Sequence, residues 1–192
     1  MNQKVAASCS QIQGLLEDFC QQQGDELARL AQQLGALFTG GGQLLLAGGA
    51  AFQPVVQLLA GHFTYRLDFD RPALPAIALG SDPILTAVMA NAGQQEQALV
   101  RHYRALNSDN HLLLLFNDGS ASASLRALCD EVLDNERPVA LLTADRQADP
   151  LCCDGLDICI DLGTALLPRQ LEITLFAGQL LCELVESELF GV

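Results

Sequence analysis

Two loops of the chain hold the residue types that bind small anions or sugars. The first loop, Ala47–Pro54, contains Gly48, Gly49 and Phe52 and runs into a helical pattern that Pro54 opens. Small residues before a helix leave backbone N–H groups exposed, and the N-terminus of a helix attracts negative charge. The loop therefore predicts an anion site, although the Phe52 ring would fill part of it with apolar bulk.

The second loop, Asn117–Ser124, is rich in hydroxyl groups and also precedes a helical pattern. It includes Asp118, Gly119 and Ser120, and the Ser120 hydroxyl can donate a hydrogen bond to a phosphate oxygen. Asp118 opposes such a ligand, because a carboxylate about 4 Å from a singly charged anion costs on the order of 4 kcal/mol. A structural interpretation stays open for both loops, since such turns commonly cap helices, here through Ser120 or Ser122.

Neither the histidines nor the cysteines show a metal-binding spacing. The chain has three histidines, His62, His102 and His111. No metal-ligand spacing such as HExxH surrounds His62, and each of the three is interpreted as a surface or satisfied side chain. Cys152, Cys153 and Cys159 form the one cysteine cluster, but no histidine lies near enough to complete a tetrahedral set. The sequence therefore predicts no metal, no other cofactor and no catalytic residue.

The elements that must position these loops follow from hydrophobic periodicity. Short apolar runs predict five strands, at Gln43–Ala47, Leu74–Leu79, His111–Phe116, Pro138–Leu142 and Asp157–Ile160. Helical spacing predicts helices between and after them, at Pro54–Arg66, Asp82–Ala92, Gln94–Leu106, Ser122–Leu133 and Leu167–Phe190. Continuous apolar strands that alternate with helices are typical of a parallel sheet covered on both faces. The predicted fold is therefore α/β, a three-layer αβα sandwich with a five-stranded parallel sheet and a long C-terminal helix.

The first 39 residues are predicted to form two helices separated at Gly24-Asp25. Apolar residues recur at helical spacing on both sides of this dipeptide, which supplies a break and an N-cap. We therefore expect residues 1–39 to be a helical hairpin arm for oligomerisation and residues 40–192 to be the α/β domain.

The charge balance excludes one class of partner. The 192 residues carry 23 acidic and 10 basic side chains, a net charge of −13. Such a chain repels a phosphate backbone, so direct binding to nucleic acid is not expected. No segment approaches the roughly 20 apolar residues of a membrane span, and the N-terminus has no apolar signal core. These observations predict a cytoplasmic protein that does not contact membranes.

Several motifs spread over nearly the whole chain point to one family. They include Arg71–Leu79, Ser81-Asp82-Pro83, Ala90-Asn91, Leu125–Leu128 and Leu181–Glu186. Together they resemble the phosphoheptose isomerase branch of the sugar-isomerase (SIS) domain proteins. The resemblance implies the SIS fold, with the phosphosugar loops at Gly48, Gly49, Phe52, Asp118, Gly119 and Ser120.

The same resemblance implies that functional positions have changed. Gly49 and Phe52 stand where the family's first loop has a sugar-binding Asn and a Ser, and Asp118 stands among the positions of the hydroxyl-bearing second loop. The family's zinc-binding His and Glu correspond to Leu58 and His62.

The final helix of the family usually adds a Gln and a His to the zinc site, and these correspond to Leu171 and Gln179 here. With the metal ligands replaced, the resemblance favours a non-catalytic binding or scaffold protein over an enzyme. Two alternatives stay open: a phosphoheptose isomerase that converts sedoheptulose 7-phosphate to a heptose 7-phosphate, and a sugar- or anion-sensing SIS module.

The resemblance also implies partners. The end of the chain, Leu181–Phe190, is similar to the branch of DnaA initiator-associating (DiaA-like) proteins. That likeness implies a homotetramer that binds the replication initiator DnaA and regulates chromosome replication. An acidic protein can act near DNA in this way if it contacts a basic DNA-binding protein.

Overall fold

The computed structural model describes residues 2–106 and 109–191. Its centre is one sheet of five parallel strands in the order β2-β1-β3-β4-β5. The strands are β1 (Gln43–Gly48), β2 (Ala76–Ala78), β3 (His111–Asn117), β4 (Val139–Thr143) and β5 (Ile158–Asp161). The predicted five-stranded parallel sheet is confirmed, and each strand begins and ends within one residue of its predicted bounds, except that β2 begins two residues late.

The central strands are buried along their whole length. Every residue of β3 and β4 is buried, and Leu113 and Leu114 of β3 face opposite apolar clusters. A strand that is covered on both faces needs apolar side chains at successive positions, and this explains the continuous runs in the sequence. The register pairs Leu45 with Leu113 and Leu115 with Leu141.

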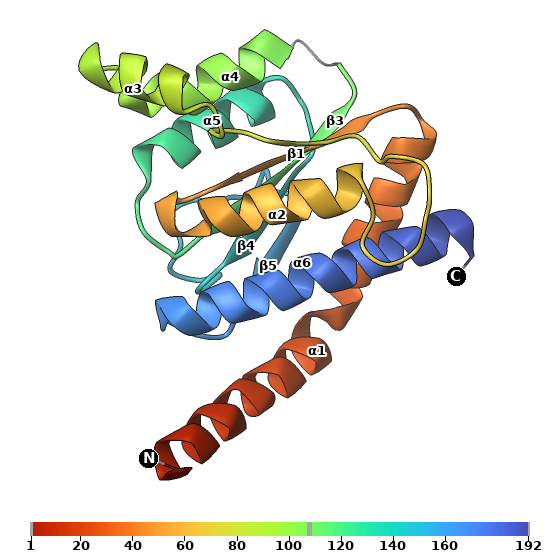
Figure 1. The fold of residues 1–192 in the computed structure, drawn as a ribbon. Helices are drawn as coiled ribbons and strands as arrows, with labels where there is room; N and C mark the ends of the chain where they lie inside the picture. Colours follow the sequence, from red (N-terminus) through yellow and green to blue (C-terminus); the bar gives the residue numbers. More distant parts are fainter. Residues whose placement is uncertain (1, 107–108, 192) are drawn as a thin grey trace.

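Helices cover both faces of the sheet, as Figure 1 shows. One face packs against α1 (Asn2–Thr39), α2 (Gln53–Thr64) and α6 (Leu167–Phe190), and the other packs against α4 (Ala98–Leu106) and α5 (Ala123–Asp134). The short helices are η1 (Ala50–Phe52), α3 (Pro83–Asn91) and η2 (Gln95–Gln97). The predicted three-layer arrangement is therefore confirmed. Among the described residues, no helix has the length and apolar character needed to cross a membrane.

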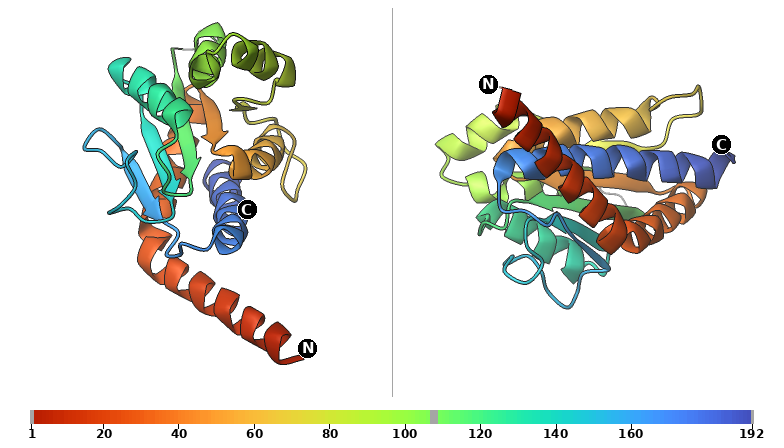
Figure 2. Two further views of the ribbon diagram at one scale, coloured as in Figure 1. Left: turned by 90° about the vertical axis from the view of Figure 1, so that its left-hand side faces the viewer. Right: turned by 90° about the horizontal axis from the view of Figure 1, so that it is seen from below.

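The N-terminal arm differs from the prediction. Instead of two helices that form a hairpin, α1 is one helix of 38 residues that passes through Gly24 and Asp25. Figure 2 shows that it changes direction part-way and that its N-terminal part projects from the body. A single glycine costs a helix only about 1 kcal/mol relative to alanine, so it does not end a helix whose following turns are buried, as Leu27 and Leu30 are here.

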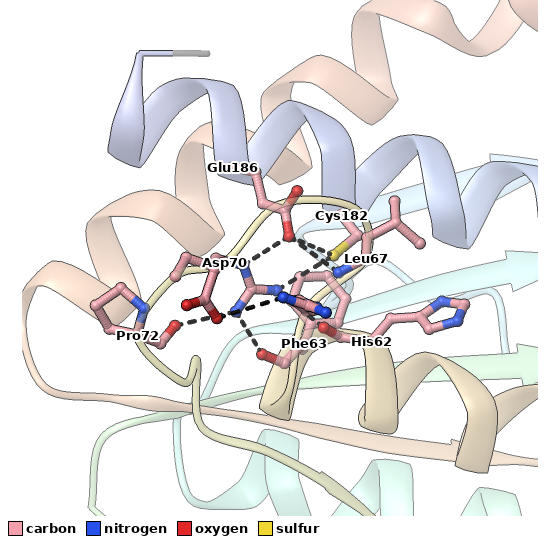
Figure 3. Close-up of polar contacts among 9 residues, drawn as sticks. His62, Phe63, Leu67, Asp70, Pro72, Cys182 and Glu186 are labelled. Atoms are coloured by element: carbon pink, nitrogen blue, oxygen red, sulfur yellow. Dashed lines mark hydrogen bonds and ion pairs between the residues drawn. The ribbon is translucent and has the colours of Figure 1, made fainter.

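A buried ion pair fixes the C-terminal end of α2 (Figure 3). Arg71, in the loop before β2, donates from Nε to Glu186 Oε1 of α6 at 2.6 Å. Its terminal nitrogens donate to the carbonyl oxygens of His62 and Phe63 at 2.9 and 2.8 Å. The Arg71 and Glu186 side chains are 0% and 4% exposed. This cluster, the Arg71–Glu186 clamp, satisfies the last carbonyls of α2 and ties that helix to α6.

Candidate active site

A cavity of about 230 Å³ lies at the carboxyl edge of the sheet, between segments that follow β1, β2 and β3. This is where open parallel sheets bind ligands, beside the point at which the strand order reverses. Its polar lining consists of Gln53, Asp82, Thr86, Gln95, His102 and Ser124. The cavity therefore brings together side chains from four helices, α2 to α5, and from the loop around η2.

Gln53 and Gly80 join the loops on one side of the cavity. Gln53, the first residue of α2, donates from Nε2 to the carbonyl oxygen of Leu79 at 2.9 Å. Gly80 has a φ of +75°, a left-handed conformation that glycine adopts without strain. This turn aims the Gly80 N–H at Nδ1 of His102, at 3.3 Å.

His102 is thereby set in a defined tautomer. Because Nδ1 accepts the Gly80 N–H, a neutral His102 carries its proton on Nε2. The ring is half-buried on α4 and lines the cavity. Its Nε2–H is then a hydrogen-bond donor for an oxygen atom of a ligand.

Asp82, the N-cap residue of α3, lines the same cavity. Its Oδ1 accepts the backbone N–H groups of Ile84 and Leu85 at 2.9 and 3.0 Å. Among the described residues no hydrogen bond reaches Oδ2, and the side chain is exposed. One carboxylate oxygen is thus fixed by the helix, and the other can accept a proton.

The residues predicted in the first loop have mainly structural roles. Phe52 is 1% exposed and belongs to the apolar cluster beneath α2, so its ring does not fill the cavity as expected. Gly48 accommodates it: a Cβ at Gly48 would lie 2.8 Å from Phe52 Cβ. The N–H of Gly49 donates to Phe116 O at 3.0 Å, and the N–H of Phe52 donates to Gly49 O at 2.8 Å. Two of the N–H groups expected to bind an anion are therefore used within the protein.

The second predicted loop turns back on itself. Asp118 Oδ1 accepts the N–H of Ser120 at 2.9 Å. Hydrogen bonding by the Ser120 side chain lowers the pKa of Asp118, with a smaller contribution from this backbone bond and against the opposing effect of burial. Gly119 between them has a φ of +85°. Ser122, and not Ser120, caps α5 by accepting the N–H of Leu125 at 3.4 Å. On this side the cavity is lined by Ser124 of the first turn of α5, and Asp118, Gly119 and Ser120 are not part of that lining.

A buried carboxylate that the sequence did not reveal supports this second loop. Asp149, between β4 and β5, is 4% exposed and accepts hydrogen bonds from Asn117 Nδ2 at 2.8 Å and from the Thr143 hydroxyl. Its Oδ1 also accepts the N–H of Leu151 at 2.7 Å. The Asn117 amide in turn donates to Ser120 O at 3.0 Å. Asp149 therefore links the carboxyl ends of β3 and β4, although a lone Asp in a loop gives no signal in the sequence.

Fold and site together define a doubly wound α/β protein with a ligand cavity at the switch point of its sheet. Solved structures with the same fold include phosphoheptose isomerases from Francisella tularensis (TM-score 0.86, 20% identity, 96% of this chain and 97% of that one) and Neisseria gonorrhoeae (TM-score 0.85, 16% identity, 97% and 98%). No family model matches the chain.

Sequence relatives identify the family. The phosphoheptose isomerase of Desulfovibrio desulfuricans is 31% identical over 183 residues, which cover 92% of this chain and 83% of the relative. That of Burkholderia pseudomallei is 30% identical over 153 residues, 79% and 76% of the two chains. The chain belongs to the phosphoheptose isomerase family.

These comparisons correct two predictions. The interpretation as a non-catalytic binding or scaffold protein that acts with the replication initiator is wrong, because relatives matching most of the chain are isomerases. The expectation that the chain is not an enzyme is overturned by the same finding. That expectation gave too much weight to the residues exchanged at the metal positions and too little to the similarity of the whole chain.

The residues at the family's zinc positions do not form a zinc site. Leu58 and Leu171 have no donor atom, and the amide of Gln179 is a weak substitute for an imidazole. His62, one turn beyond Leu58 on α2, has a buried Nδ1 without a hydrogen-bond partner among the described residues. Burial lowers the pKa of His62, against a smaller opposing effect of the Glu186 charge. One imidazole nitrogen is not a tetrahedral set, so any proton transfer must be derived from other groups.

Proposed function

We propose that the chain is a phosphosugar isomerase that interconverts sedoheptulose 7-phosphate and a heptose 7-phosphate. The family supports this reaction class, and one observation in the structure carries it. Asp82 and His102 come from different elements, line one cavity, and each keeps one side-chain atom for a ligand. Aldose–ketose isomerisation needs two such groups, a base for a carbon-bound proton and a donor to the neighbouring oxygen.

The reaction follows from this pair. Oδ2 of Asp82 removes a proton from C1 of the ketose, while His102 Nε2–H donates a hydrogen bond to the C2 oxygen, where negative charge develops. The resulting enediolate regains the proton at C2 from Asp82, and the hydroxyl proton moves from O1 to O2. A neutral imidazole fits this role, because it stabilises the oxyanion without giving up a proton that it must then recover.

The phosphate group is assigned to the N-terminal end of α5. Ser124 lies in the first turn of this 12-residue helix and lines the cavity, and helix N-termini favour anions. Asp118 lies on the preceding loop outside this lining, where its hydrogen bond to Ser120 holds it.

The test is turnover of sedoheptulose 7-phosphate, followed by NMR detection of the heptose product. Asp82→Asn removes the base but keeps a good helix cap, so we expect turnover to fall by about 10²- to 10⁴-fold with little change in stability. Asp134→Asn is the matched control, an exposed carboxylate at the far end of α5 that should leave turnover unchanged. Absence of turnover by the folded wild type, with or without added Zn²⁺, would overturn the proposal, as would full activity of Asp82→Asn.

We further propose that the chain forms a homo-oligomer, with a tetramer favoured, through the projecting part of α1. Support comes from its exposure: Val5 is 60% exposed, and Ile12, Leu15 and Leu16 are only partly covered. Sedimentation equilibrium should give a multiple of 20.5 kDa, and a monomer mass would contradict it. A cytoplasmic location stays a prediction.

A further inference from the structure

Two cysteines at β5, an edge strand of the sheet, lie in direct contact. Cys152 belongs to the β4–β5 connection and Cys159 to β5, and their Sγ atoms are 2.7 Å apart. Both are free thiols. A disulfide bond is about 2.05 Å long, so a small shift of the loop is enough for the two sulfur atoms to bond.

The pair lies beside an open cavity. This cavity, of about 550 Å³, is lined by Arg29, Arg146, Cys152, Cys153 and Cys159 together with acidic side chains that include Asp157. Cys152 is half-buried and Cys159 is 6% exposed. A small oxidant can therefore reach Cys152 from solvent.

The other cysteines lack this arrangement. Cys129 and Cys182 are fully buried in the two apolar clusters, and Cys9 and Cys20 lie exposed on α1. Cys153 lies exposed next to Cys152 on the same cavity. Within the part of the chain that the structure describes, Cys152 and Cys159 are the pair of cysteines whose sulfur atoms contact each other.

We propose that Cys152 and Cys159 are a redox-sensitive dithiol that hydrogen peroxide converts to a disulfide and that a dithiol reductant restores. The Cys152 thiolate attacks one peroxide oxygen, so that an S–O bond forms, the O–O bond breaks, and the departing hydroxide takes up a proton to become water. The Cys159 sulfur then attacks the Cys152 sulfenic acid. The S–S bond forms, the S–O bond breaks, and hydroxide leaves with the Cys159 proton as a second water.

The order of the two thiols follows from their surroundings. Burial, followed by the contact with Cys152, raises the pKa of the Cys159 thiol far above its ordinary value, although Arg146 opposes this. Cys159 is therefore a poor first nucleophile, and the more accessible Cys152 reacts with the oxidant. Cys159 acts second, as the resolving thiol.

Closing this bridge constrains the segment that joins β4 to β5. The bond would join residue 152 of the connection to residue 159, the second residue of β5. A short covalent ring removes conformations from the unfolded chain, so the oxidised protein should unfold at a higher urea concentration.

The pair can be identified by peptide mapping after peroxide treatment. Cleavage before aspartate separates residues 149–153 from residues 157–160, because Asp154 and Asp157 lie between the two cysteines. We expect these two peptides to be covalently linked after oxidation, to separate after dithiothreitol, and to account for a loss of two hydrogen atoms from the intact protein.

Three serine variants make the assignment specific. Cys153→Ser is the matched control and should form the link as the wild type does, whereas Cys152→Ser and Cys159→Ser should not form it. In Cys159→Ser a trapped sulfenic acid should react with dimedone at Cys152. The proposal is overturned if wild-type protein shows no link between these peptides, or if the link persists in Cys152→Ser and is lost in Cys153→Ser. Circular dichroism of each reduced variant excludes misfolding as the cause.

Discussion

The polar groups at the two ends of helix α2 differ in how fully they are bonded within the protein. At the C-terminal end, Arg71 and Glu186 are buried and bonded to each other, and the arginine also bonds to the helix carbonyls. At the N-terminal end, Gln53, Asp82 and His102 each use one polar atom to hold a neighbouring loop or helix. The remaining atoms of Asp82 and His102 face a cavity.

This difference places the groups that stabilise the fold at one end of α2 and the groups available for proton transfer at the other. A buried charge has lost its hydration, so removal of its partner is expensive, whereas a half-exposed group regains hydrogen bonds from water. Groups that take part in proton transfer must keep an atom for the substrate and therefore cannot be fully bonded within the protein. We therefore expect variants at the clamp to change unfolding and variants at the cavity to change turnover.

The largest effect on stability is expected at Glu186. Glu186→Ala leaves Arg71 charged and buried without its partner, and the free energy of unfolding should fall by about 3–5 kcal/mol. Urea-induced unfolding measures this change. Glu183→Ala, exposed on the same helix, is the control and should change it by less than about 0.5 kcal/mol. A loss below about 1 kcal/mol for Glu186→Ala would show that the clamp does not hold α2.

At the cavity, a pair of variants separates the two nitrogens of His102. His102→Asn keeps an acceptor near the Nδ1 position for the Gly80 N–H but removes the Nε2 donor. We expect kcat to fall by about 10²-fold, the usual cost of one oxyanion donor, with unfolding nearly unchanged. His102→Gln places an amide donor near the Nε2 position and should keep more of the activity. Equal activity of both variants would mean that Nε2 does not contact the reacting oxygen.

The smallest effect is expected from His62, which lies beside the clamp. Burial lowers its pKa, so the unfolded chain binds a proton more readily than the folded one. Stability is then present above the ordinary value of about 6.5 and decreases as the pH falls from there toward the lowered folded pKa. His62→Gln should remove this part of the pH dependence, measured by urea unfolding at about pH 8 and about pH 5. An unchanged pH dependence would contradict the prediction.

The strands and most helices could be predicted because burial constrains each residue type locally. Residues 112–116 of β3 are buried on both faces of the sheet, so this run had to be continuously apolar. The break at Gly24 was wrong because local propensity is weak, and packing of the later turns of α1 carries the helix through the glycine.

The candidate site was located less well. The loops after β1 and β3 lie at the carboxyl ends of their strands, where the sequence placed them. Within these loops, however, Phe52 packs into the core and Asp118 accepts a hydrogen bond from its own loop. Asp82 and His102 were not singled out as site residues, since they are 20 positions apart and no motif joins them. Their convergence depends on the turn at Gly80 and on the packing of α3 and α4.

The sequence by itself determined the α/β class, the strand positions and, through whole-chain likeness, the phosphoheptose isomerase family. These properties depend on many residues at once, so exchanges at a few positions do not erase them. The tertiary structure alone decided which polar groups meet: Arg71 with Glu186, His102 with the Gly80 N–H, Asp149 with Asn117, and Cys152 with Cys159. Except for Cys152 and Cys159, each pair is separated by at least 20 residues, and all four come together only when the elements pack, because a contact depends on distance in space and not on spacing along the chain.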